Sequence, residues 1–178
     1  MAEDNKETWT NYLALTTVIF AVCATLSTFK GGGFSTRSVM SQSQASDQWA
    51  FFQAKSIKSY MYQMQKENLE LKLKDLPRGT AKETVNSYQG KIADYTKKID
   101  KYEQEKTEIQ DKAKKLESVR DEAQKHSQAF GMAIIFLQIA ILLSSIAGLL
   151  KKKPVWYAGL ATGIVGLFFF ANGFLLIV

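Results

Sequence analysis

The stretch Ser127–Leu150, which reads SQAFGMAIIFLQIAILLSSIAGLL, decides the fold of this chain, because it runs for 24 residues without a charged side chain. Two other stretches share this property: the 22 residues of Thr8–Phe29 and the 25 residues of Pro154–Val178. An α-helix needs about 20 apolar residues to cross the roughly 30 Å hydrocarbon layer of a bilayer. The sequence therefore predicts three membrane spans and an integral membrane protein.

The charged residues are confined to the rest of the chain. All 23 basic and 17 acidic residues lie in the remaining 107 residues, which are about 37% charged. The middle segment, Lys30–Gln128, has 19 Lys and Arg against 14 Asp and Glu, with the two signs interleaved. Interleaved charge is typical of a solvated helix face. The net charge of +6 therefore does not indicate a nucleic-acid partner.

The residues that most enzymes and metal sites need are scarce. The chain has one histidine, His126, and one cysteine, Cys23, so it cannot form an intramolecular disulfide or a clustered zinc site. Its glycine run, Gly31–Gly33, is followed by Phe34 and lacks the Lys-Ser/Thr pair of a P-loop. We expect no enzymatic activity, no cofactor and no metal. The acidic N-terminus is the reverse of a signal peptide's basic leader, so the first span is expected to be retained.

The turn signals divide the chain between its spans. Gly31–Gly33 is expected to break the first helix, Asp75–Gly79 to form a turn, and Thr80–Glu83 to open a second helix as a capping box. No turn signal follows until Leu150, so this helix should run straight into the second span. The expected segments are an N-terminal tail (1–11), transmembrane helix 1 (12–29), a helical hairpin with a turn near 75–80 (30–128), transmembrane helix 2 (129–150), a basic loop (151–154) and transmembrane helix 3 (155–178).

The second half of the hairpin has a heptad pattern, with residues that alternate by three and four. The positions are Val85, Tyr88, Ile92, Tyr95, Ile99, Tyr102, Lys106, Ile109, Ala113, Leu116, Arg120 and Ala123. This spacing is typical of a coiled coil. The predicted fold class is therefore all-α, with three transmembrane helices and a long antiparallel coiled-coil hairpin between spans 1 and 2, and we expect it to be homo-oligomeric.

The first half of the hairpin must supply the opposite face of this coiled coil. If residue i lies opposite about residue 155 minus i, the predicted pairs are Leu71 with Val85, Met64 with Ile92, Tyr60 with Tyr95, Ile57 with Ile99 and Val39 with Leu116, with Gln53, Ala50, Ser46 and Ser43 between them. Trp49 and Phe52 would then point beside the contact and expose a large apolar area. Such a patch is normally covered, and a second copy of the chain is the expected cover, with another membrane protein or lipid as alternatives.

Lys151-Lys152-Lys153 is the topology signal, because it forms the short loop between the second and third spans. Short basic loops stay in the cytoplasm. The N-terminus would then also be cytoplasmic and the hairpin extracytoplasmic. The first span alone favours the opposite orientation, since an acidic tail precedes it and Lys30 and Arg37 follow it.

Small residues in the spans are candidates for close helix packing. They are Gly159, Gly163 and Gly166 in the third span and Ala140, Ser144 and Gly148 in the second. Three amides in or near the spans, Asn11, Gln138 and Asn172, could line a pore or hydrogen-bond neighbouring helices.

Three segments together resemble a family of small bacterial inner-membrane proteins known only as a domain of unknown function. They are WTNYLALT at 9–16, QASDQWAFFQAKSIK at 44–58, and Val155-Trp156-Tyr157 before a glycine-rich last span. The central run is the specific part, although Phe51 and Phe52 stand where at least one Tyr is expected. The resemblance implies a bacterial origin and three spans, and it brings no activity. It draws attention to the following residues as an oligomer or partner contact: Asp47, Trp49, Phe51, Phe52, Gln53, Lys55 and Lys58.

These observations lead to three functional hypotheses. The first is a non-enzymatic, homo-oligomeric membrane protein that acts as a scaffold or interaction platform through its helical stalk. The second is an oligomeric channel or transport component in which Gln138 or Asn172 faces a water path. The third is an accessory subunit that docks another membrane complex through Trp49 and Phe52.

Overall fold

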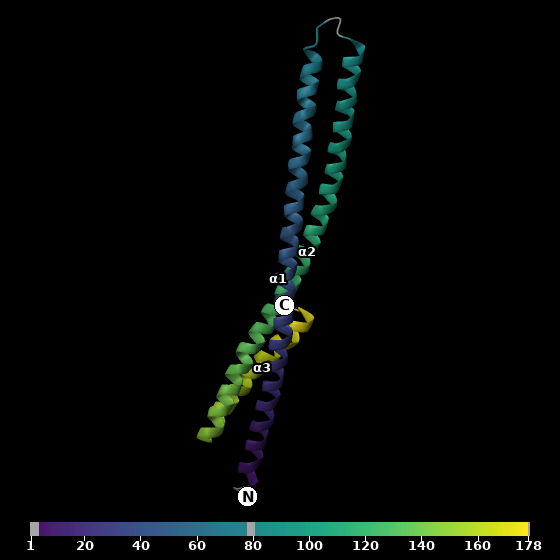
Figure 1. Ribbon diagram of the computed structural model, residues 1–178. Helices are drawn as coiled ribbons and strands as arrows, with labels where there is room; N and C mark the ends of the chain where they lie inside the picture. The colour runs from purple at the N-terminus through teal and green to yellow at the C-terminus, as the bar shows by residue number, and fades with distance from the viewer. Residues whose placement is uncertain (1–3, 78–80, 178) are drawn as a thin grey trace. The chain divides into compact units, whose positions relative to one another are not determined.

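Three α-helices make up the fold. The computed structural model describes residues 4–77 and 81–177, and within them it contains no strand. The helices are α1 (Asp4–Lys74), α2 (Lys82–Leu150) and α3 (Lys153–Leu175) (Figure 1). Each contains a stretch long and apolar enough to cross a membrane. The predicted all-α class with three candidate spans is confirmed.

The helix ends follow the turn signals of the sequence. α1 ends at Lys74, where the backbone N–H of Asp75 donates to the Leu71 carbonyl (3.1 Å). α2 begins at Lys82 and continues without interruption to Leu150, as expected. Thr80, the first residue of the predicted capping box, lies outside the described residues. The loop after α2 passes through Lys151 at a φ of 52°, and Pro154 lies in the first turn of α3.

The predicted helix break at Gly31–Gly33 is wrong, since α1 passes through all three glycines. A glycine in a helix interior costs only about 1 kcal/mol relative to alanine, so packing can override it. Gly31 is buried, and a Cβ there would lie 3.0 Å from the Cβ of Phe130 on α2. The glycine thus permits α1 to lie close to α2 at Phe130.

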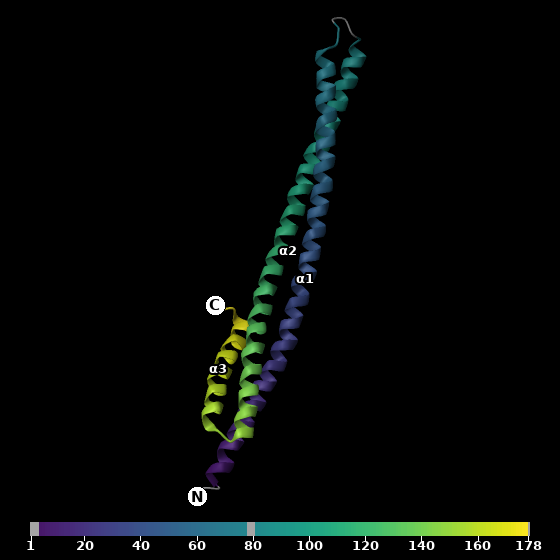
Figure 2. The ribbon, with the colours of Figure 1, turned by 90° about the vertical axis from the view of Figure 1, so that its left-hand side faces the viewer.

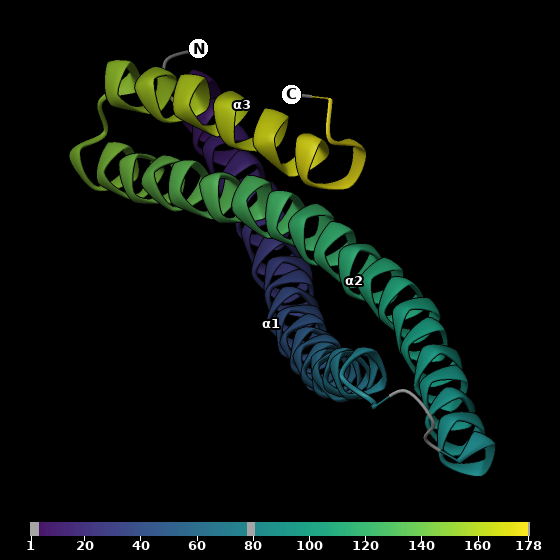
Figure 3. The same cartoon turned by 90° about the horizontal axis from the view of Figure 1, so that it is seen from above.

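The chain divides into two compact units. The first consists of Met1–Met40 and Val119–Val178 and contains the three candidate spans. Within it α3 turns back and runs antiparallel along the end of α2 (Figures 2 and 3). Its core is a cluster of buried apolar side chains: Phe20, Ala24, Ala133, Leu137 and Ala140.

The second unit, Ser41–Ser118, is a hairpin in which α1 and α2 run side by side (Figure 1). On α2, all twelve heptad positions from Val85 to Ala123 are buried or half-buried. The ring of Tyr62 on α1 lies 5.5 Å from that of Tyr95 and stacks on Tyr102 at 5.9 Å. The sequence pattern therefore identified the inner face of α2.

The predicted inner face of α1 is wrong, because every residue assigned to it is exposed. Those residues are Val39, Ser43, Ser46, Ala50, Gln53, Ile57, Tyr60, Met64 and Leu71. Eleven buried or half-buried residues with a three-four spacing take their place. They are Ser41, Ala45, Gln48, Phe52, Lys55, Ser59, Tyr62, Lys66, Leu69, Leu73 and Leu76. Several of them are polar, so a prediction that places apolar residues inside selects the opposite face.

Candidate functional site

Trp49 and Phe52, expected to point away from the hairpin contact, are half-buried in it. The indole Nε1–H of Trp49 donates to a carboxylate oxygen of Glu117 on α2 (2.9 Å). The ring of Phe52 meets that of Trp49 edge to face at 5.5 Å, and Lys106 Nζ lies 5.5 Å from the centre of the Phe52 ring. Both aromatic residues therefore contact α2 and stabilise the hairpin. The prediction that they form an exposed patch is wrong.

Lys55 forms a second link between the two helices. Its Nζ lies 2.6 Å from Glu105 and 5.3 Å from the centre of the Tyr102 ring. The hydrogen bond between them raises the pKa of Lys55 above its usual value and lowers that of Glu105 below its usual value. Both shifts favour the charged forms, so the pair is ionised at neutral pH.

One helical turn further along α1, Ser59 forms a third link. It is almost fully buried, and its hydroxyl donates to Glu103 (2.8 Å). Lys106 donates to both oxygens of the same carboxylate at 2.9 Å. Hydrogen bonds from Lys106 and then Ser59 lower the pKa of Glu103. The inner contact of the hairpin is thus a series of polar and aromatic links.

The four remaining residues that the resemblance singles out in the 44–58 segment are not buried against α2. Asp47, Phe51, Gln53 and Lys58 are exposed. The segment therefore divides between an inner face that holds the hairpin and an outer face that is open. Among the described residues there is no group of three or more His, Cys, Asp or Glu side chains that could hold a metal ion.

An apolar stripe on the outer face of α1 was missed by the sequence analysis. Its members are exposed and are spaced alternately by four and three residues. We call them the outer stripe: Ala50, Ala54, Ile57, Met61, Met64, Asn68 and Leu71. Ile57, Met64 and Leu71 are 60%, 70% and 61% exposed. The three-four spacing of the stripe is visible in the sequence. However, four of its members, Ala50, Ile57, Met64 and Leu71, had been assigned to the inner face.

The small residues of the third span lie against α1 and α2. A Cβ at Gly159 would lie 3.2 Å from the Cβ of Leu143 and 3.3 Å from the Ala140 carbonyl and the Ser144 hydroxyl. A Cβ at Gly163 would overlap the ring of Phe20 on α1. The structure thus brings Gly159 together with Ala140 and Ser144, two of the packing candidates in the second span.

The other two small residues differ in how closely they are packed. A Cβ at Gly166 would lie 2.8 Å from Leu137 Cγ. Gly148 is only half-buried, and a Cβ there would reach Leu13 at an ordinary 3.7 Å. The fully buried row on α2 instead continues from Ala140 and Ser144 to Ala147.

The three amides of the spans have different surroundings. Asn172 is buried, and its side-chain oxygen accepts a hydrogen bond from the backbone N–H of Ile177 (2.7 Å). It therefore caps its own helix, where Leu176 adopts a left-handed conformation. Asn11 and Gln138 are exposed. Of these two, Gln138 lies in the middle of the uncharged stretch of α2.

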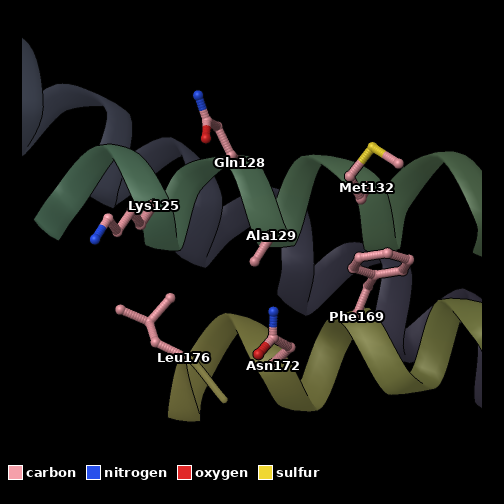
Figure 4. Close-up of a pocket in the computed structure, with 7 residues that line it drawn as sticks. All are labelled: Lys125, Gln128, Ala129, Met132, Phe169, Asn172 and Leu176. Atoms are coloured by element: carbon pink, nitrogen blue, oxygen red, sulfur yellow. The ribbon is translucent and has the colours of Figure 1, made fainter. Parts of the chain in front are cut away.

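A pocket of about 430 Å³ lies between α2 and α3 in the first unit (Figure 4). Phe169, Asn172 and Leu176 point from α3 toward α2. Lys125 and Gln128 line one end and Met132 the other. The lining is thus polar at Lys125, Gln128 and Asn172 and apolar at Ala129, Met132, Phe169 and Leu176.

The fold and these contacts define a class: an all-helical protein with three candidate membrane spans and a long two-helix hairpin inserted between the first two. The chain belongs to the family described as Domain of unknown function (DUF4337), whose pattern matches residues 9–176. No curated protein and no solved structure matches the chain.

Proposed function

We propose that this protein is a non-enzymatic, homo-oligomeric protein of the bacterial inner membrane that acts as a structural scaffold or interaction platform through its hairpin. One observation carries the proposal: in the hairpin, α1 turns polar residues toward α2 and leaves a row of apolar residues exposed. Apolar Ile57, Met64 and Leu71 are exposed, whereas polar residues such as Lys55 and Ser59 face α2.

The exposure of these apolar residues has an energetic consequence. Burial of apolar surface contributes about 25 cal/mol per Å² and is the main favourable term in helix association in water. The hairpin leaves four large apolar side chains of α1 exposed, namely Ile57, Met61, Met64 and Leu71, so their burial against a second protein surface would add stabilising free energy. Contiguous exposed apolar patches of this kind mark interaction sites.

The proposed orientation rests on the loop between α2 and α3. Lys151, Lys152 and Lys153 lie next to candidate spans on both sides and are exposed. By the preference of short basic loops for the cytoplasm, the loop and the N-terminus are cytoplasmic and the hairpin is extracytoplasmic. The hairpin would then act outside the cytoplasm, among the partners present there.

The mass of the protein in native-lipid particles tests the proposal. The full chain is extracted from its membrane with a lipid-preserving polymer and measured by native mass spectrometry. A species at an integral multiple of the 20.0 kDa chain mass is expected. A particle with a single copy and no other protein would refute homo-oligomerisation. One copy bound to a fixed foreign subunit would favour an accessory role instead.

A second candidate function, an oligomeric channel or transport component, is favoured by Gln138 alone. This amide is exposed at the middle of an uncharged span, and a polar side chain at that depth needs a partner or water. Gln138→Leu should abolish ion or solute flux in liposomes if Gln138 lines a path. Unchanged flux in this variant, with Ile139→Leu as control, would exclude that role for Gln138.

A further inference from the structure

The outer stripe of α1 has the residue pattern of a second coiled-coil face. Its residues alternate by four and three from Ala50 to Leu71, so they fall on positions a and d of a heptad. Position d is occupied by Ala50, Ile57, Met64 and Leu71, and position a by Ala54, Met61 and Asn68. The stripe residues are exposed, whereas the residues that contact α2 are buried or half-buried, so both faces can be occupied at once.

We propose that two copies of the chain pair through the outer stripe as a parallel, in-register, two-stranded coiled coil. The inference rests on the homo-oligomer proposed above and names the surface and geometry of its contact. Two copies inserted in one membrane with the same topology leave their first span in the same direction. Their α1 helices therefore run parallel, and each d residue faces its own counterpart.

The charged residues beside the stripe fit this arrangement. In a parallel coiled coil, position g of one helix lies beside position e of the partner, five residues further along. Glu67 is at g and Lys72 is at e, so a pair of opposite charges forms twice across the two-fold axis. Reversing one helix would place each flank beside the same flank of its partner. The charges at e are Lys58 and Lys72 and those at g are Glu67 and Lys74, so an antiparallel pairing leaves the e flank with basic residues only, whereas the parallel pairing sets Glu67 beside Lys72.

Asn68 supplies a further argument for a defined register. A single Asn at position a specifies register and oligomer state in coiled coils, because its amide finds a partner only opposite the same residue of the other helix. Asn68 is the polar member of the stripe and is exposed. In the parallel, in-register pair, the two Asn68 side chains meet at the axis and satisfy each other.

The size of the stripe is sufficient for a specific contact. Its large side chains are more than half exposed. Together with the neighbouring Tyr60 they offer on the order of 600 Å² per copy, which brings a symmetric pair to the lower end of the range of stable interfaces, about 1,200 Å². Two membrane-anchored copies need less contact area than two free molecules, because anchoring already holds them at a high local concentration.

Disulfide trapping in native membranes tests the geometry on the full chain. Cys23→Ser first removes the natural thiol, and Ile57→Cys or Leu71→Cys then places one thiol at position d. Mild oxidation should convert either variant into a covalent dimer. The control is Gln104→Cys, an exposed position on α2, which should stay monomeric on a non-reducing gel.

Two further experiments test the relative direction of the two α1 helices and the contribution of the Glu67–Lys72 pair. Differently tagged copies carrying Ile57→Cys and Leu71→Cys are expressed together, and they should give no mixed dimer, because 14 helical residues separate the two thiols by about 21 Å in register. Glu67→Lys should lower the trapped fraction of the Ile57→Cys variant several-fold, and Lys72→Glu in the same chain should restore it.

Each outcome bears on a different part of the proposal. A mixed dimer would overturn the parallel register. Trapping of Gln104→Cys as efficient as that of Ile57→Cys would reveal random collision and overturn the interface. An oligomeric native mass without trapping at Ile57 or Leu71 would overturn the interface and leave the homo-oligomer standing. A single-copy mass would overturn both.

Discussion

Gly163 and Gly32 show what one residue type does in two environments. The backbone of α3 at Gly163 lies directly against the Phe20 ring, so this position has no space for a side chain. Around Gly32 on α1 there is nothing within 4 Å of the position that a Cβ would take. The first glycine is required by packing, and the second only weakens its helix.

These environments predict opposite effects of the same substitution. Gly163→Ala forces the Phe20 ring to move and should destabilise the protein by about 1–3 kcal/mol, the usual cost of overpacking. Gly32→Ala should stabilise it by about 0.5–1 kcal/mol, because alanine loses less backbone entropy in a helix. Thermal unfolding of the full chain in mild detergent compares the two. A lower midpoint for Gly32→Ala than for Gly163→Ala would contradict this explanation.

At this scale the sequence could select candidates but could not choose among them. The spacing of four singled out Gly159 and Gly163, which lie close to neighbouring helices, but on α2 it offers no choice between Gly148 and Ala147, which are similarly small neighbours. Ala147 is fully buried and Gly148 only half-buried. Which of the two faces a neighbouring helix depends on the rotation of α2 about its axis, and composition does not determine that rotation.

The two helices of the hairpin differ in how readily their sequence reveals their packing. On α2 the heptad of Val, Ile and Tyr marks the face that lies against α1, since the apolar residues are inside. On α1 two three-four patterns coexist, one of mixed polar and apolar residues and one that is apolar except for Asn68, and the mixed one faces α2. Apolar spacing therefore predicts the helix and its period, but it selects the wrong face when the exposed row of a helix is more apolar than the row that faces its neighbour.

The polar links of the hairpin predict an acid-sensitive element. The pKa values of Glu103 and Glu105 are lowered in the folded hairpin, so their stabilising contribution is complete above the unfolded pKa of 4.5. It is lost as pH falls through the lower, folded values. The pKa of Lys55 is raised above 10.5, so its contribution is lost only as pH rises through that higher value. Helix content followed during heating should therefore show lower stability at about pH 3.5 than at pH 7.

A matched substitution isolates this effect. Glu105→Gln keeps the shape of the side chain and removes its charge, so the variant should lose part of the acid dependence. Glu108→Gln, an exposed carboxylate on the same helix for which no ion pair occurs among the described residues, is the control. Equal acid dependence in all three proteins would show that the link from Glu105 to Lys55 does not stabilise the hairpin.

At the scale of the whole molecule, the distribution of charge predicts the topology. Three uncharged stretches are separated by a charged hairpin on one side and the triple-Lys loop on the other. In a Cys23→Ser background, Ser87→Cys should react with a membrane-impermeant maleimide added to intact cells. Lys152→Cys should react only after the membrane is opened, because short basic loops stay inside.

Both positions are exposed, so accessibility within the fold does not bias the comparison. The opposite labelling pattern would mean that the acidic tail and the basic residues after the first span determine the orientation. It would place the hairpin in the cytoplasm and leave the three-span architecture unchanged.

Met61 and Met64 make the outer stripe sensitive to oxidation. Their thioethers are 54% and 70% exposed, and oxidants convert such sulfur atoms to sulfoxides. The sulfoxide is polar, so one added oxygen atom per side chain would turn the centre of an apolar surface into a hydrated one. An oxidant such as peroxide would then act on this surface before two copies pair, and methionine sulfoxide reductases would reverse the damage.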